Sequence, residues 1–177
     1  AENEFWFLNP FVGVAVEGGL DFGLARPGTN AYAGGIKVRN AADPGSGVLL
    51  DMQISGTDYY DPSSSPAKCP DSNVLTLDHF SYHAVNGNYE TQPGNYRESL
   101  LGGSEGYYGI PYETGNRGDR LPVLEGEGFE NIGGVMYPAG NVLSPGAEIA
   151  LTFRISLPEP CIGSFTNGKI FFWGEII

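Results

Sequence analysis

The chain of 177 residues carries 21 acidic and 9 basic side chains, which gives a formal net charge of −12. A surface of that sign repels phosphate groups, so nucleic acids and anionic membranes are poor partners. Glycine (27 residues) and proline (13 residues) are frequent, but 41% of the residues are hydrophobic and 12% are aromatic, which argues against disorder. The length therefore indicates a single domain in which turns separate many short strands.

Residues 1–19 are unusually apolar, and Asn9-Pro10 interrupts them. Proline cannot donate to a strand ladder, so this pattern predicts two short strands with a kink between them. These strands either complete the sandwich of their own chain or add to the sheet of a neighbour. The Gly18-Gly19 pair is a candidate hinge between this segment and a single β-sandwich domain over 20–177. The side chains that a donated strand would present are Phe5, Trp6, Phe7, Leu8, Phe11, Val12, Val14 and Val16.

Two strands are predicted inside the stretch from 20 to 61. Residues 35–40 and 48–55 each alternate apolar and polar side chains, as expected for strands with one buried face. Residues 43–47, Asp-Pro-Gly-Ser-Gly, suit a short loop between paired strands. The stretch therefore predicts a β-hairpin.

Further strands are predicted over 74–85, 149–157 and 169–177. The first is read as one continuous strand, with Leu75 and Leu77 on one face and Phe80 and Tyr82 on the opposite face. Alternation over 149–157 places the odd-numbered residues in the core. Residues 86–122 show little sustained alternation and are interpreted as a long, loop-rich insertion. No window has the periodicity of a capped helix, so the predicted fold is an all-β sandwich of the Ig-like or jelly-roll type.

The two cysteines, Cys69 and Cys161, lack the neighbouring Cys or His that a zinc site needs, and a disulfide between them is expected. The chain starts with Ala1, which is typical of a mature N-terminus after signal-peptide removal. No run approaches the length of a membrane-spanning helix. These features predict a secreted, extracellular or cell-surface protein with no membrane span.

The segment Leu20-Asp21-Phe22-Gly23-Leu24, followed by Pro27-Gly28-Thr29, Ile36-x-Val38-x-Asn40 and Ile54-x-Gly56-Thr57-Asp58, resembles secreted surface proteins with Ig-like or jelly-roll sandwiches. The layout is similar to that of TasA-type and camelysin-type biofilm fibre subunits of archaea and bacteria. The resemblance covers residues 20–58 and, more weakly, 143–177. It implies that a processed N-terminal strand inserts into the next subunit of a filament.

Catalytic and metal-binding motifs are absent from the sequence, so no enzymatic activity and no cofactor are expected. His79 and His83 would lie about 13 Å apart along a strand, too far for one metal ion. Asp58 and Asp61 resemble a carboxylate pair, but neighbours of this kind arise by chance in an acidic chain. Calcium needs only oxygen ligands, yet no Asp-x-Asp-x-Asp loop is present. A second acidic cluster comprises Glu125, Glu127 and Glu130.

The sequence therefore predicts a secreted structural subunit that polymerises head to tail with other copies of itself into a pilus-like filament. The donated strand would be the N-terminal apolar segment. The alternative is a monomeric extracellular module that binds glycans or cell-surface proteins through loop tyrosines. Those tyrosines are Tyr89, Tyr96, Tyr107, Tyr108 and Tyr112, which could instead pack in a second small core under the insertion.

Overall fold

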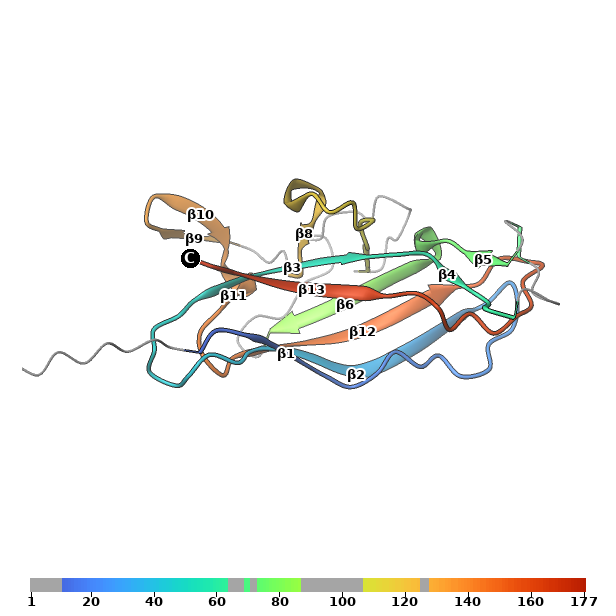
Figure 1. Cartoon of the computed structure of the whole chain (residues 1–177), viewed down its shortest axis with the longest axis horizontal. Helices are drawn as coiled ribbons and strands as arrows, with labels where there is room; N and C mark the ends of the chain where they lie inside the picture. The colour runs from blue at the N-terminus through green and yellow to red at the C-terminus, as the bar shows by residue number, and fades with distance from the viewer. Residues whose placement is uncertain (1–10, 64–68, 71–72, 87–106, 125–127) are drawn as a thin grey trace, which may run out of the picture.

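The computed structural model describes residues 11–63, 69–70, 73–86, 107–124 and 128–177. Two sheets face each other in an elongated body (Figure 1), which confirms the predicted all-β sandwich. The strands and 3₁₀ turns are β1 (Val14–Glu17), β2 (Asn30–Asn40), β3 (Leu50–Gly56), β4 (Tyr59–Tyr60), β5 (Val74–Leu75), η1 (Leu77–His79), β6 (Phe80–Asn86), β7 (Tyr108–Gly109), η2 (Arg117–Asp119), β8 (Leu121–Pro122), β9 (Phe129–Ile132), β10 (Val135–Pro138), η3 (Ala139–Asn141), β11 (Val142–Leu143), β12 (Glu148–Ser156) and β13 (Ile170–Ile176).

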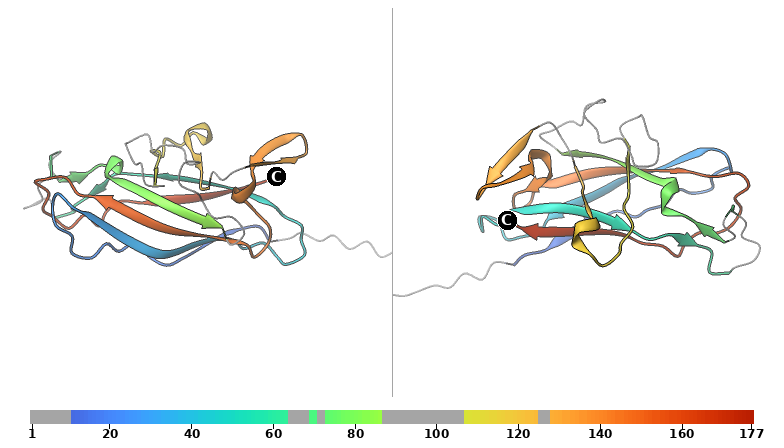
Figure 2. Two further views of the ribbon diagram at one scale, coloured as in Figure 1. Left: turned by 180° about the vertical axis from the view of Figure 1, so that it is seen from behind. Right: turned by 90° about the horizontal axis from the view of Figure 1, so that it is seen from above.

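The first sheet has the order β1-β2-β12-β6-β7, and all its neighbouring strands are antiparallel. In the second sheet β3 is central, with β13 along one side and the short strands β11 and β8 along the other. Seen from behind and from above (Figure 2), the long strands of the two sheets run along the length of the body. Strands β4 and β5 form a separate small pair.

The core lies between the inner faces of the two sheets. In β12 the exposure alternates as predicted, because Ile149, Leu151, Phe153 and Ile155 are buried and their neighbours are not. The residues of β3 that face them are fully buried as well. Each such side chain contributes about 1.5–3 kcal/mol through removal from water.

The predicted hairpin between β2 and β3 is wrong, because the two strands belong to different sheets. Residues 41–49 cross from one sheet to the other, a gap of about 10 Å between packed sheets. The fully buried Asn40 holds this crossing: its amide donates to the carbonyls of Val48 (2.9 Å) and Leu143 (2.8 Å), and its oxygen accepts from the Ala42 N–H (2.9 Å). The turn-forming residues of 41–49 therefore connect the two sheets instead of closing a hairpin.

Strand β2 is longer than predicted, because it starts at Asn30 and contains a bulge. The register with β12 shifts between Leu151 and Phe153, opposite Gly34 and Gly35. Gly35 has φ +79°, a conformation that glycine adopts without strain. The glycine pair therefore allows β2 to extend back to Asn30, although the sequence predicted that the strand starts at residue 35.

The predicted single strand over 74–85 is also wrong, since the 3₁₀ turn η1 divides it. The Leu77 N–H donates to Asp58 Oδ1 at 2.7 Å, which holds the turn. The turn shifts the phase of the alternation, so Leu75, Leu77, Phe80 and Tyr82 are all buried instead of lying on opposite faces. Phe80 and Tyr82 thus join the main core.

The predicted insertion over 86–122 falls partly outside the described residues. Its described part supplies β7 to the first sheet and β8 to the second. The β9–β10 hairpin that follows was not predicted. It is a two-stranded unit that projects from one end of the body (Figure 1), and it pairs with no other strand in the described part of the chain.

The two ends of the body differ in what they carry. The hairpin end carries β9–β10, the start of β1 and the end of β13 (Figure 1). The loop end carries 20–29, before β2, and 157–169, between β12 and β13. Pairing of Asn30 with Ser156 brings these two connections together.

Candidate functional site

Strand β13 forms an open edge of the second sheet. It pairs with β3 on one side, and no described strand pairs with its other side. The Thr57 N–H donates to the Lys169 carbonyl at 2.9 Å, so the odd-numbered residues direct their backbone groups toward β3. The residues whose N–H and C=O point away from β3 are Ile170, Phe172, Gly174 and Ile176. An edge of this kind is a template for another strand.

The two sheets come together at the hairpin end of this edge. A Cβ atom at Gly174 would lie 2.7 Å from Val14 Cγ2 and 3.0 Å from Leu50 Cδ1. Only a glycine permits β1 and β13 to approach so closely. Val14 thereby closes one end of the space between the sheets.

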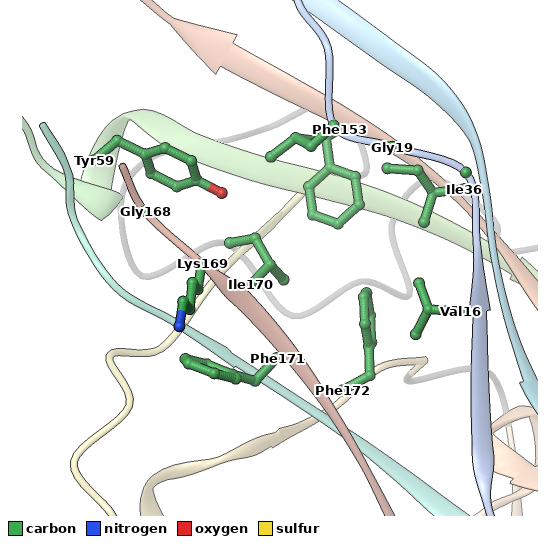
Figure 3. A pocket seen from close by; sticks show the side chains of 12 residues that line it. Val16, Gly19, Ile36, Tyr59, Phe153, Gly168, Lys169, Ile170, Phe171 and Phe172 are labelled. Carbon is green, nitrogen blue, oxygen red and sulfur yellow. The ribbon is translucent and has the colours of Figure 1, made fainter. Parts of the chain in front are cut away.

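Beyond this contact the sheets separate and leave an apolar cavity of about 320 Å³ beside β13 (Figure 3). Val16 shows how open it is: its side chain is 51% exposed, whereas its cross-strand partner Val38 is completely buried. We call this cavity the edge groove. Its apolar lining includes Val16, Leu20, Ile36, Phe153, Ile170 and Phe172.

A second cavity, of about 660 Å³, lies at the loop end. It shares Leu20 and Tyr59 with the edge groove, so the two spaces adjoin along one side of the sandwich. We call it the loop-end cavity. Its lining also includes Phe22, Leu24, Leu157, Cys161 and Phe165.

Tyr59 stands where the two cavities meet. Its ring stacks on Phe80 with centroids 4.6 Å apart, and burial raises the pKa of its hydroxyl to about 12. A Cβ atom at Gly168 would lie 2.6 Å from Tyr59 Cδ1, so the ring packs directly on the glycine backbone. The residues just before β13 are thus held against the core.

The structure places the predicted donor residues in two settings. Val14 and Val16 form part of β1, which pairs with β2 of the same chain. Phe11 and Val12 precede β1 and are 61% and 37% exposed. The Phe11 N–H donates to Asp43 Oδ2 at 3.0 Å. The remaining predicted donors, Phe5, Trp6, Phe7 and Leu8, lie outside the described residues.

The two glycines of the predicted hinge differ in their surroundings. Gly18 has φ +95°, and a Cβ atom there would lie 2.7 Å from the Gly35 carbonyl oxygen, so it packs against β2. Gly19 has no heavy atom within 4 Å of such a Cβ and could accept a side chain. The turn out of β1 therefore depends on Gly18 in particular.

The predicted disulfide between Cys69 and Cys161 is confirmed. It joins two connections at the loop end that are 92 residues apart in the sequence. Cys161 also lines the loop-end cavity, so the bridge fixes one wall of that cavity.

A polar cluster on the outer face of the second sheet supports β13 from behind. The Arg120 guanidinium lies 3.6 Å from the centroid of the Trp173 ring, and the indole N–H donates to Ser55 Oγ at 3.0 Å. Glu113 accepts hydrogen bonds from Ser55 and Arg120, and these partners lower its pKa to about 2. The residues after β7 are thereby attached to the sheet.

The loop tyrosines do not form one surface. Tyr108 is buried in the core, which contradicts its use as an exposed binding residue and agrees with the alternative that it packs in a core. Tyr107 lies on the outer face of the first sheet, where its ring centroid is 4.4 Å from the Arg154 guanidinium carbon and 6.2 Å from the Tyr32 centroid. Burial and bonds to nearby carboxylates raise the pKa of Tyr112. Tyr89 and Tyr96 are outside the described residues.

Among the acidic and histidine candidates, Asp58 and Asp61 make hydrogen bonds that hold local structure, and both histidines lie in regular elements. Asp58 holds η1, and Asp61 accepts from Ser63 and from the Ser164 N–H (2.9 Å). His79 lies in η1 and His83 in β6. Across the described ranges, no group of three or more His, Cys, Asp or Glu side chains is placed to hold a metal ion. Glu130 lies in β9, whereas Glu125 and Glu127 fall outside the described residues.

Comparisons with protein families, with curated proteins and with solved structures found no match to this chain. The likeness to fibre subunits therefore depends on the residues quoted for it above. Among the described residues, no helix is long and apolar enough to cross a membrane.

The open edge of β13 was not predicted from the sequence. Residues 169–177 were predicted as a strand, but not as an open edge. A signal was present, because Gly174 interrupts an otherwise bulky strand, and a glycine there often marks close approach of another backbone.

Proposed function

We propose that this chain is a secreted structural subunit of an extracellular, pilus-like filament. The N-terminal segment of one copy would add as a strand to β13 of the next copy. The observation that supports this most directly is a strand edge, β13, with no partner among the described strands on its outer side, beside an open apolar groove. Main-chain hydrogen bonds to the edge would supply affinity, and alternate side chains would fill the groove.

The residues that precede β1 have suitable length and character for this role. The twelve residues 1–12 would span about 40 Å when extended, whereas the seven residues of β13 need about 23 Å. Residues 5–8 are all apolar, and in an extended strand Phe5 and Phe7 would share one face that suits the aliphatic and aromatic lining of the groove. Because β1 pairs within its own chain, we assign the donated part to residues 1–12.

The geometry of such a contact is heterologous, since a donor segment on one copy meets a groove on another. Contacts of this kind generate open filaments when the rotation does not close. Copies with a net charge of −12 also repel one another, so the attraction must be mainly apolar. We therefore expect assembly to accelerate as salt is raised from about 0.01 M to about 0.15 M, which shortens the screening length from about 30 Å to about 8 Å.

Amide hydrogen exchange tests the proposal at single residues. A chain lacking residues 1–12 is mixed with a peptide of residues 1–12, and exchange is followed by NMR. We expect the outward amides of Ile170, Phe172, Gly174 and Ile176 to become protected on peptide addition. The amide of Trp173 faces β3 and serves as the internal reference that changes little.

The control peptide carries Phe5→Asp and Phe7→Asp, which keep the backbone but remove the apolar side chains. It should protect the outward amides far less than the native peptide. Equal protection by both peptides, or none by the native peptide, would contradict strand donation. Full-length chain should form filaments that the truncated chain does not form.

A monomeric glycan-binding or adhesion module is the second candidate. The exposed ring of Tyr32 (53%) near Tyr107 favours it, because flat aromatic faces stack on sugar rings. A glycan array probed with the full chain and with Tyr32→Ala tests this candidate. Binding that is lost in the variant but unaffected by deletion of residues 1–12 would favour the module over the filament subunit.

A further inference from the structure

Exposed large apolar side chains other than tyrosine gather at the two ends of the body. Among the described residues, those at the hairpin end are Phe11, Val12, Phe129, Val135, Met136 and Ile176, and those at the loop end are Leu24 and Ile162. The remaining one, Val16, lines the edge groove. The outer face of the first sheet instead carries charged pairs such as Lys37 with Glu148 (2.7 Å). Apolar contact between copies is therefore available end to end.

The β9–β10 hairpin is the most prominent of these apolar features. Its two-residue turn uses Gly133 and Gly134 at φ +62° and +89°, as a tight hairpin turn requires. The register places Phe129 and Met136 on the same face, and they are 63% and 56% exposed. A two-stranded hairpin is marginally stable alone in water, so this one would gain from a covering surface.

The loop-end cavity offers such a surface on another copy. Its volume is about 660 Å³, and Leu24, which lines it, is fully exposed. Ile162 is 62% exposed in the same connection as Cys161, which also lines the cavity. The cavity adjoins the edge groove through Leu20 and Tyr59, so a copy whose segment enters the groove also lies near this cavity.

We infer that the β9–β10 hairpin of one copy packs into the loop-end cavity of the next copy of this chain. This second contact rests on the proposed filament function. The proposed donor segment, residues 1–12, leaves the body before β1 at the hairpin end, and 12 residues reach at most about 43 Å. The copy that accepts the segment must therefore lie close to the hairpin that projects from the same end.

Disulfide trapping tests the contact in assembled full-length chains. Met136→Cys and Leu24→Cys variants are mixed, assembled and oxidised, and covalent dimers are measured on non-reducing gels. We expect a covalent dimer, linked between positions 136 and 24, in filaments and none in unassembled chains. The matched control pairs Met136→Cys with Lys37→Cys, whose side chain is exposed on the outer face of the first sheet, and should give no dimer.

The outcomes separate the two hypotheses. Filaments that form without dimers at positions 136 and 24, or with equal dimers in the control, would overturn the hairpin contact and leave strand donation intact. A native chain that remains monomeric at every concentration would overturn both. A cross-link specific to positions 136 and 24 supports the contact.

A second variant removes the apolar face of the hairpin. Phe129→Ser with Met136→Ser should raise the critical concentration for assembly about tenfold or more, because two half-exposed apolar side chains lose their burial. The thermal midpoint of the unassembled chain should not change, since neither side chain belongs to the core. An unchanged critical concentration at an unchanged midpoint would refute the inference.

Discussion

Replacing Asn141 by alanine should strongly destabilise the sandwich. This side chain is fully buried in η3, and its amide donates to Asp51 Oδ1 and to the Met52 carbonyl, both at 2.6 Å. Its oxygen accepts from the Leu124 N–H at 3.0 Å. Alanine would leave one carboxylate, one carbonyl and one N–H buried without these partners.

The expected loss follows from the cost of unsatisfied buried groups. Each costs about 1–3 kcal/mol, and the charged one costs more, so we expect Asn141→Ala to lower the free energy of unfolding by about 3–5 kcal/mol. In a protein of this size that corresponds to roughly 10 °C in melting temperature. Asp51 adds a pH signature. Burial already raises its pKa, and loss of the Asn141 bond would raise it further.

Because a raised carboxyl pKa penalises the ionised folded state, the extra destabilisation should be full at neutral pH, should shrink as the pH falls through the raised pKa of Asp51, and should be largely gone by about pH 4. Urea unfolding of the unassembled chain, followed by Trp fluorescence at neutral pH and at about pH 4, measures the free energy of unfolding under both conditions. Asn131→Ala is the matched control, since Asn131 is exposed and caps only the Gly134 N–H. A loss below about 1.5 kcal/mol at neutral pH, or no dependence on pH, would refute the reasoning.

Three further changes probe other contacts. Joint replacement of Cys69 and Cys161 by alanine should cost about 4–5 kcal/mol in urea unfolding, as expected for closure of a long loop; a cost under about 1 kcal/mol would contradict this role. Gly168→Ala should lower the melting temperature by several degrees because its methyl group meets a buried tyrosine ring, whereas Gly19→Ala has open space and should not. Glu113→Gln should remove a stabilisation that is complete above about pH 4.5 and is lost as the pH falls toward about 2, measured as the difference between the two urea curves across pH. Parallel curves would exclude that carboxylate as the cause.

The fold class could be read from alternation, and the sheet assignment could not. In β12 the alternating pattern was predicted with its buried face, because local periodicity reports that face directly. The β2–β3 connection was misassigned because Asn40, rather than the turn residues, determines it through a distant carbonyl of Leu143. The phase shift at Leu77 likewise depends on Asp58, which is far away in the sequence.

The candidate site was only half visible in the sequence. An apolar N-terminal segment and a terminal strand can each be recognised locally. Whether β13 lies at an edge depends on where the other strands lie, and no pattern within residues 170–176 shows that. The β9–β10 hairpin did have a local signal, Ile132-Gly133-Gly134-Val135, which is typical of a two-residue hairpin turn. Its exposure, however, depends on the tertiary arrangement.

The strand order has a consequence for how the chain folds. Strand β2 pairs with β12 and β3 pairs with β13, so each of these early strands can pair only after a strand much later in the chain has been made. Such high contact order predicts slow folding, on the order of milliseconds to seconds. Neither sheet can close while only the first half of the chain exists. We therefore expect both sheets to form only after β12 and β13 have been made, so the open edge of β13 also forms late.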